Sequence, residues 1–309
     1  MNKKFFIIVG SGRNGSTLLE QILNYHPDVF VAHETRYYSY LIKKNNFKDK
    51  SIQQIFNLLN NYWWIKEYKI QFEIFERVFN GINISCIEDK VFFSIIISAS
   101  QNSNKYILGE KTPRHFLNAS YLMKNYSLKV IHIVRDPRDV LSSYLSQPFG
   151  PSSSYEVANL YTHVQSEHEK NKKSDNYLVI KYEDLVSEIE SSLNLVCNFL
   201  EIPYSNDLLK FHARKEKGFN KVQSHHFKTT KPISNSRLNL WKNKLNYIQV
   251  GYIELKLKNF FDEFEYKPSL TEINKPLLKL FHIYSFVIGF LNKILYRKIR
   301  SYIIRYKND

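Results

Sequence analysis

A strand, a glycine-rich turn and a helix follow one another at the start of this sequence, and no other feature constrains its fold as strongly. The apolar residues 5–9 predict a strand, which Gly10 ends. The following segment runs from Gly12 to Thr17, and a helical pattern of apolar residues begins near Ser16. Glycines allow backbone N–H groups to converge on one space, and a helix N-terminus favours negative charge. We therefore expect an anion-binding loop between the first strand and the first helix.

This loop differs from a Walker A motif in the position of its cation. Gly10 and Gly15 have the Walker spacing, but Ser16 occupies the place of the lysine. The cation lies inside the loop instead, at Arg13. The missing lysine argues against an ordinary ATP-hydrolysing or kinase site. The strand, the helix and the internal arginine favour an anion site over a simple glycine turn.

Short apolar runs alternate with helical patterns along the rest of the chain. The expected strands are residues 29–32, 106–109, 129–134 and 177–181, and the expected helices begin near Asp136, Tyr182 and Leu238. This alternation predicts an α/β fold in which a mostly parallel sheet is flanked by helices. We expect one domain over residues 1–270, in which residues 36–104 form a mainly helical insertion that shapes the acceptor region. A basic amphipathic tail over residues 271–309 follows it.

A second basic element follows the predicted strand 129–134. Arg135 stands at the carboxyl end of that strand, where open α/β sheets bind ligands. Asp136 has the position of a helix N-cap, and Pro137 suits the first turn. Ser143 lies two helical turns beyond Arg135, so an arginine and a serine could hold a second phosphate. Taken alone, however, this element is more typical of a capped helix with solvated arginines.

Taken together, the loop and the second basic element resemble the two signatures of sulfotransferases that use 3′-phosphoadenosine 5′-phosphosulfate (PAPS). The resemblance continues through residues 109–114 and 180–185 and extends over residues 4–262, although residues 36–104 have no firm counterpart. It implies a P-loop-type sheet, PAPS as co-substrate and no metal. The cofactor-binding residues that it implies are Gly12, Arg13, Asn14, Gly15, Ser16, Thr17, Arg135, Ser143, Tyr182 and Lys231.

The segment Glu34-Thr35-Arg36 is similar to an element of the tyrosylprotein sulfotransferase branch. The resemblance implies that Glu34 is the catalytic base and that Arg36 is a substrate-side or Glu34-orienting cation. It also implies that Lys111 and Arg13 stabilise the transferring sulfuryl group. His33 is a rival base, because imidazole titrates near neutrality. Adjacent residues at a strand end point in opposite directions, so we expect only one of the two to face the phosphosulfate and favour Glu34.

An alternative role for Glu34 is to cap the next helix. The histidines give no metal site by spacing, because no third ligand accompanies either His225-His226 or the pair His163 and His168.

Only two cysteines occur, which excludes a disulfide framework. The N-terminal apolar run is too short for a signal peptide or a membrane span. We therefore expect a cytoplasmic location.

The formal net charge is +15, and nearly half of it lies in residues 275–309, which hold eight Lys and Arg residues and one Asp. Residues 280–292 contain no charged side chain, but a membrane-spanning helix needs about 20 apolar residues. Two interpretations stay open: an amphipathic helix on an anionic membrane surface, or a terminal helix packed on the domain. Nucleic acid is not an expected partner, because no nucleic-acid motif accompanies the charge.

The sequence thus predicts a sulfotransferase that transfers the sulfuryl group of PAPS to an acceptor hydroxyl of a carbohydrate, a glycolipid or another small alcohol. Two alternatives are a P-loop kinase-like phosphotransferase and a non-catalytic protein that binds anions or lipids. Preference for ATP with Mg²⁺ would distinguish the first, and binding without transfer would distinguish the second.

Overall fold

The computed structural model describes residues 3–101, 103, 105–147, 149–213 and 234–269, together with seven residues between 280 and 291. Its described residues fall into two compact units. The first comprises Met1–Ile133 and Asn171–Ile233, and the second Val134–Lys170 and Ser234–Asp309.

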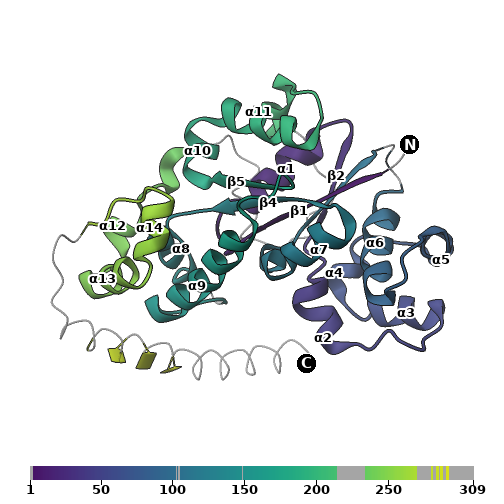
Figure 1. Ribbon diagram of the computed structural model, residues 1–309, viewed down its shortest axis with the longest axis horizontal. Coiled ribbons are helices and arrows are strands. Elements are labelled where there is room, and N and C mark those ends of the chain that lie inside the picture. The colour runs from purple at the N-terminus through teal and green to yellow at the C-terminus, as the bar shows by residue number, and fades with distance from the viewer. Residues whose placement is uncertain are drawn as a thin grey trace. The chain divides into compact units, whose positions relative to one another are not determined.

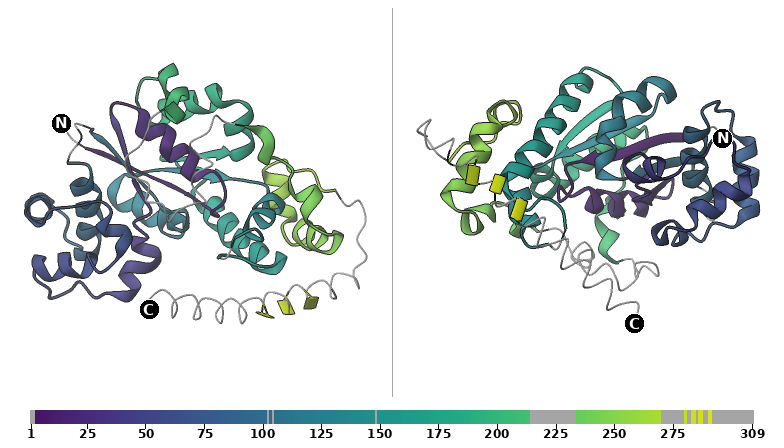
Figure 2. Two further views of the ribbon diagram at one scale, coloured as in Figure 1. Left: turned by 180° about the vertical axis from the view of Figure 1, so that it is seen from behind. Right: turned by 90° about the horizontal axis from the view of Figure 1, so that it is seen from below.

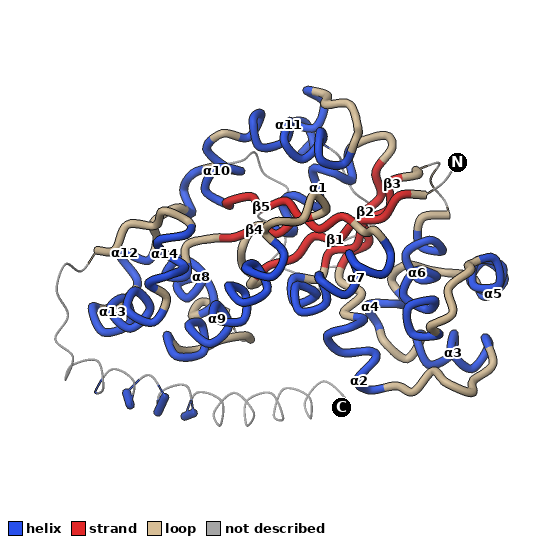
Figure 3. Tube along the Cα trace, viewed as in Figure 1, coloured by secondary structure: helices blue, strands red, loops and turns tan. Residues whose placement is uncertain are grey.

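Five strands form one sheet in the order β2-β3-β1-β4-β5 (Figure 3). The strands are β1 (Lys4–Gly10), β2 (Val29–His33), β3 (Ile107–Lys111), β4 (Lys129–Val134) and β5 (Tyr177–Lys181). β1 pairs with β3 and with β4, and β2 pairs with β3, all in parallel. The mostly parallel sheet and its five predicted strands are therefore confirmed, and the chain has the P-loop-type fold.

Three strands extend beyond their predicted ends. β1 and β2 do so by a residue at an end, whereas β3, predicted over residues 106–109, extends to Lys111. The parallel pairing continues across these residues, with Ile8 of β1 and His33 of β2 both opposite Lys111. This register brings the carboxyl ends of three strands together, next to the loop that follows β1.

Helices cover both faces of the sheet. In the first unit, the described helices outside residues 37–99 are α1 (Ser16–Tyr25), α7 (Ala119–Tyr126), α10 (Tyr182–Ser187) and α11 (Ile189–Leu200), with the 3-10 helices η2 (Pro113–Asn118) and η3 (Asn206–Ala213). In the views of Figures 1 and 2, α1 and α11 lie on one side of the strands, and α7 lies on the other with the helices of residues 37–99. The strand interiors are apolar and fully buried, as in Ile7, Ile8 and Ile131.

The predicted insertion is mainly helical. It contains the π-helix η1 (Tyr37–Leu41) and the helices α2 (Ile42–Lys44), α3 (Ile52–Leu59), α4 (Trp63–Lys66), α5 (Phe72–Gly81) and α6 (Ile87–Ala99). Ser51 begins α3 with a capping box, in which its hydroxyl accepts from Gln54 N–H and the Gln54 side chain accepts from Ser51 N–H. Phe75 and Phe92 are fully buried among the aromatic side chains of this region.

In the described part of the second unit, the regular structure is helical apart from the end of β4. Its helices are α8 (Pro137–Tyr144), α9 (Ser154–Asn171), α12 (Trp241–Lys244), α13 (Tyr247–Lys256) and α14 (Lys258–Glu263), with the 3-10 helix η5 (Asn235–Arg237). Asp136 caps α8 as predicted, because its carboxylate accepts from Arg138 N–H. The single helix expected over residues 238–261 is instead three helices, since Asn246 starts α13 with a new capping box.

Candidate active site

The loop between β1 and α1 has the backbone of an anion cradle. Gly12, Arg13 and Gly15 all have left-handed φ angles, of 76°, 55° and 88°. Successive left-handed turns direct neighbouring N–H groups into one concavity, and Gly15 is also the N-cap of α1. The geometry therefore fits the phosphate-binding role expected of residues 12–17.

Asn14 anchors this loop to the sheet through its side chain. Its Nδ2 donates to the carbonyl oxygen of Ile133 in β4 at 2.5 Å, and the residue is fully buried. A Cβ on Gly10 would lie 1.8 Å from this Nδ2, so Gly10 leaves the room for the contact. The side-chain amide of Asn14 is therefore engaged with β4, and its predicted cofactor contact stays a prediction.

Tyr182 lies against the loop backbone. A Cβ on Gly15 would lie 2.4 Å from Cδ2 of Tyr182, which is buried at the start of α10. The glycine is thus required both by its left-handed φ and by the aromatic ring behind it. The structure brings Tyr182 to the loop that the sequence assigned to the cofactor.

Lys111 and Glu34 form an ion pair at the carboxyl end of β3. Lys111 Nζ lies 2.9 Å from Oε1 of Glu34, and the lysine side chain is fully buried. Arg36 Nη2 lies 3.2 Å from Oε2 of the same carboxylate. Lys111 also has a second carboxylate partner that was not predicted: Oε2 of Glu20, from α1, lies 3.3 Å from Lys111 Nζ.

These contacts determine the charge states of the pair. Burial favours the neutral acid, but the charges of Lys111, His33 and Arg36 lower the pKa of Glu34 well below its ordinary value. Burial opposes the charge of Lys111 too, but Glu34 and Glu20 raise the pKa of that lysine. Both groups are therefore ionised at neutral pH.

His33 belongs to the same network. Its Nδ1 lies 2.8 Å and 2.9 Å from the two carboxylate oxygens of Glu20. Because a carboxylate only accepts, Nδ1 carries the ring proton. The prediction that only one of His33 and Glu34 faces the phosphosulfate stays a prediction, and Lys111 and Glu20 connect both side chains in one network. The alternation rule holds only within a strand, and β2 ends at His33, while Glu34 has a left-handed φ of 39°.

Three consecutive N–H groups fix the segment that carries Glu34. Glu34 N–H donates to Lys111 O at 2.8 Å, and Thr35 N–H donates to Oε1 of Glu110 at 2.9 Å. Arg36 N–H donates to Oγ1 of Thr112 at 3.0 Å. The end of β3 thus holds each residue of Glu34-Thr35-Arg36, and Glu34 does not cap the next helix. That helix, η1, has Arg36 at its N-cap and no side-chain cap.

Glu110 is the buried centre of these contacts. It is fully buried and also accepts from the hydroxyls of Thr35 and Thr112. His115 Nδ1 lies 2.9 Å from its Oε2, while Tyr38 N–H donates to the other ring nitrogen, Nε2. Burial raises the pKa of a carboxyl group, but these partners lower the pKa of Glu110 below its ordinary value.

Aromatic side chains of the insertion flank Arg36. The guanidinium carbon lies 5.1 Å from the ring centroid of Trp64, whose Nε1 donates to Thr35 O at 3.2 Å. Tyr40 and Trp63 lie with their ring centroids 5.8 Å from that of Trp64 and are 42% and 46% exposed. An exposed aromatic patch thus begins beside the carboxylate of Glu34.

Arg135 and Ser143 lie in the second unit. Arg135 is 4% exposed, and its Nη2 donates to Arg237 O at 2.7 Å and lies 3.7 Å from Oδ2 of Asp139. Ser143 is a partly buried residue of α8. Burial raises the pKa of Asp139, although Arg135 and two backbone N–H groups oppose this. Lys231, the remaining predicted cofactor residue, lies outside the described residues.

Sequence reasoning missed Glu20 and Glu110. Glu20 was detectable as the one acidic residue in the apolar pattern of the first helix. Glu110 lies within residues 109–114, which resemble the sulfotransferase family, but the sequence analysis predicted no role for it.

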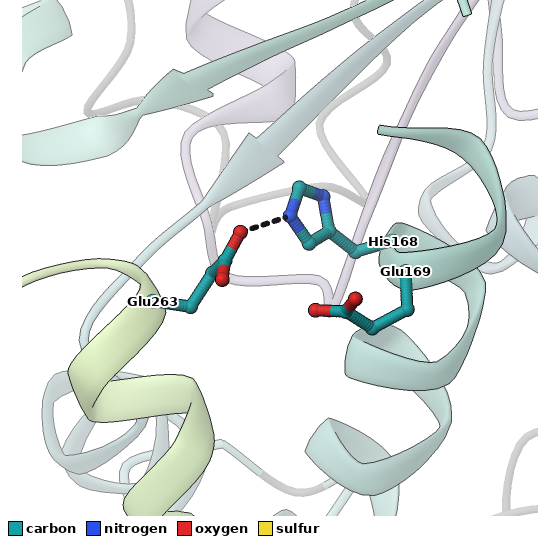
Figure 4. Close-up of side chains that lie close together, drawn as sticks. All are labelled: His168, Glu169 and Glu263. Atoms are coloured by element: carbon teal, nitrogen blue, oxygen red, sulfur yellow. Dashed lines mark hydrogen bonds and ion pairs between the residues drawn. The ribbon is translucent and has the colours of Figure 1, made fainter. Parts of the chain in front are cut away.

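One further group of possible metal ligands lies in the second unit (Figure 4). One ligand atom each of His168, Glu169 and Glu263 lies within 4.8 Å of the others, and His168 Nε2 is 3.2 Å from Oε1 of Glu263. The sequence spacing did not reveal Glu263, because it is remote from His168 in the chain. The two glutamates are exposed, and a histidine–glutamate pair accounts for the contact without an ion.

Comparison with known proteins gives a consistent family. A family model described as "Sulfotransferase family" matches residues 6–206, which is more than half of the chain. The chain is 25% identical to a protein-tyrosine sulfotransferase of Drosophila melanogaster over 249 residues, which cover 76% of this chain but 46% of that protein.

Two solved structures share the fold. The sulfotransferase domain of the Synechococcus PCC 7002 olefin synthase matches with a TM-score of 0.57 and 19% identity, covering 86% of this chain and 96% of that one. The sulfotransferase domain from the curacin biosynthetic pathway matches with a TM-score of 0.59 and 17% identity, covering 86% and 99%.

Proposed function

The chain belongs to the sulfotransferase family, and on that premise we propose that it transfers the sulfuryl group of PAPS to an acceptor hydroxyl. The single observation that carries the proposal is the ion pair between Glu34 and Lys111. It joins a carboxylate suited to take a proton with a cation suited to neutralise a transferring anion.

The reaction assigns one task to each side chain. The acceptor oxygen forms a bond to sulfur while the bond from sulfur to the bridging phosphate oxygen breaks, so 3′,5′-adenosine bisphosphate (PAP) leaves. Glu34 removes the proton of the acceptor hydroxyl. Lys111 and Arg13 neutralise charge on the sulfuryl group and on the leaving phosphate.

The remaining predicted residues bind the donor. The loop with its left-handed Gly12 and Gly15 holds the 5′-phosphosulfate. Arg135 and Ser143 hold the 3′-phosphate, together with Lys231. Tyr182 stabilises the loop from behind, since its ring lies against Gly15. This division needs no metal, because side-chain cations supply the positive charge.

The acceptor site is proposed at the aromatic patch of the exposed Tyr40 and Trp63 and the half-buried Trp64, next to Arg36. Aromatic faces beside a polar cluster suit a ring with hydroxyl groups, and we favour a carbohydrate, a glycolipid or another small alcohol. The Drosophila relative is named a protein-tyrosine sulfotransferase, so a tyrosine-containing peptide belongs in the acceptor panel.

The proposed location is cytoplasmic, with peripheral attachment to an anionic membrane through the tail. Both cysteines, Cys86 and Cys197, are free thiols. None of the helices among the described residues has the length and apolar character needed to cross a bilayer. The described residues between 280 and 291 are large apolar side chains, 44% to 63% exposed. Phe286 makes a ring contact with Tyr155, which supports the competing interpretation of a packed tail.

Calorimetric titration of PAP into the wild-type chain tests the proposal. We expect PAP to bind at least about tenfold more tightly than AMP, because only PAP has the 3′-phosphate. Replacing Ser143 by Ala should reduce this preference, whereas replacing Ser146, an exposed residue just beyond α8, should not.

Absence of PAP binding would sink the proposal, and preference for ATP with Mg²⁺ would favour the kinase-like alternative. Binding of PAP without transfer of labelled sulfate to any component of a broad extract would identify a non-catalytic anion-binding protein.

A further inference from the structure

Glu20 is a carboxylate in a place where an apolar residue would pack. It lies on α1 with Leu19, Ile22 and Leu23, all fully buried, and is itself 1% exposed. Burying a charge is costly unless partners compensate for it. Its described partners are Lys111 and His33, two of the groups assigned to chemistry.

The charges around Lys111 are not balanced one to one. A single buried ammonium contacts two carboxylates, Glu34 at 2.9 Å and Glu20 at 3.3 Å. Glu34 alone would satisfy the lysine as a counter-ion. The second carboxylate also pairs with His33, and its contact with Lys111 is additional to the counter-ion that the lysine needs.

Sulfuryl transfer supplies a reason. A base paired tightly to a lysine is a weak base, because the lysine stabilises its ionised form. When Lys111 turns toward the sulfuryl group, Glu34 loses this partner and becomes more basic. Separating Lys111 from Glu34 requires less free energy if another carboxylate remains beside the lysine.

We propose that Glu20 is a positioning residue. It holds His33 and remains the counter-ion of Lys111 when that lysine separates from Glu34. The inference rests on the proposed function, since it assumes that Lys111 meets the sulfuryl group. Glu20 acts through these neighbours and does not itself touch the acceptor.

The test is the pH profile of turnover in Glu20→Gln. The charged and titratable groups near Glu20 come from three places: His33 of β2 with Glu34 and Arg36 after it, Glu110 and Lys111 of β3, and Tyr68 of the insertion. Removing a nearby negative charge lowers the pKa of Glu34 in the complex. The acidic limb of the profile should therefore move to lower pH, by about one unit. The plateau rate should fall at least about tenfold, because Glu34 is a weaker base.

The assay measures transfer of labelled sulfate from PAPS, at a saturating concentration, to acceptors in the same extract that is used for the wild-type chain. The KM for PAPS and the affinity for PAP should stay within about threefold of wild type. Glu20→Asp restores the charge and should return the acidic limb toward its wild-type position.

Asn24→Ala is the matched control. Asn24 lies on the same helix and ties it to β2 through both the N–H and the carbonyl oxygen of Val31. Its loss should lower thermal stability and leave the acidic limb unchanged. A Glu20→Gln variant with the wild-type profile and rate would overturn this inference and leave the proposed function intact. An equal shift of the acidic limb in Asn24→Ala would do the same. A wild-type chain that does not bind PAP, or binds it and transfers nothing, would instead overturn the proposed function.

Discussion

At the scale of single residues, the behaviour of the site depends on how tightly Glu34 is held by its cations. Lys111 and Arg36 both contact its carboxylate, and its pKa lies well below the ordinary value. In this state Glu34 is fully ionised but weakly basic. On the proposed mechanism, Glu34 becomes an effective base when Lys111 takes a new anionic partner.

Replacing Glu34 by Gln should remove turnover without weakening donor binding. General base catalysis typically contributes about 10²–10⁴-fold, so the rate should fall by about 10³-fold, while the PAP affinity measured by calorimetry stays close to wild type. A variant that keeps most of its activity would point to His33 as the base. Glu73→Gln, which changes an exposed glutamate of α5, serves as the control and should be fully active.

Glu110 should matter for stability as well as for geometry. Glu110 has four hydrogen bonds within the protein, two with Thr35 and one each with Thr112 and His115. Glu110→Gln should therefore lower the free energy of unfolding by about 3 kcal/mol at pH 7. Since the pKa of Glu110 is lowered by folding, its contribution is present above the unfolded pKa of about 4 and is lost as pH falls through the folded value.

Denaturant unfolding at several pH values checks this prediction. The difference between wild type and Glu110→Gln should shrink below about pH 4. A difference that is constant with pH would show that the charge of Glu110 does not stabilise the fold. The exposed Glu73→Gln control should change stability by less than about 0.5 kcal/mol.

At the scale of elements, the loop and the ends of the strands are held by one another. Asn14 ties the loop to β4, and the residues after β2 bond to the end of β3. Protein hydrogen bonds therefore hold both segments in these conformations. The site is therefore organised in advance, which lowers the entropic cost of binding a charged donor.

Gly15→Ala tests this organisation. The φ of 88° is unfavourable for alanine, and the new Cβ would overlap Tyr182, so the loop must move. We expect a loss of about 2 kcal/mol of stability and at least about tenfold weaker PAP binding. Gly81→Ala is the control, because nothing lies within 4 Å of its Cβ position and its φ is not left-handed. Unaltered PAP affinity in Gly15→Ala would refute the role of the loop.

At the scale of the whole molecule, the net charge of +15 has two separate locations. Within the body, Arg13, Lys111 and Arg135 are assigned to an anionic donor. The basic residues after Lys275 have no place in that chemistry. Proximity to an anionic surface contributes about 1 kcal/mol per basic residue, so this tail is strong enough in principle to attach the protein to a membrane.

A chain that ends at Lys275 tests the membrane proposal. The intact chain should sediment with vesicles that contain phosphatidylserine, and less in high salt or with neutral phosphatidylcholine vesicles. The shortened chain should lose at least about tenfold in vesicle affinity and keep its PAP affinity. Equal vesicle binding by both chains would remove the membrane proposal and favour the packed tail.

The sequence by itself determined the α/β architecture, the strands and the anion loop, and it named Glu34 and Lys111 as separate candidates. These features are local, because apolar runs, glycine spacing and short motifs record them in neighbouring residues. Only the tertiary structure decided that Glu20 and Glu110 complete the site and that Asn14 turns its side chain to β4. Each of these contacts joins segments that are remote in the chain, or depends on a left-handed residue such as Glu34 that ends the alternation of the strand. Register and packing set them, and no local pattern encodes either.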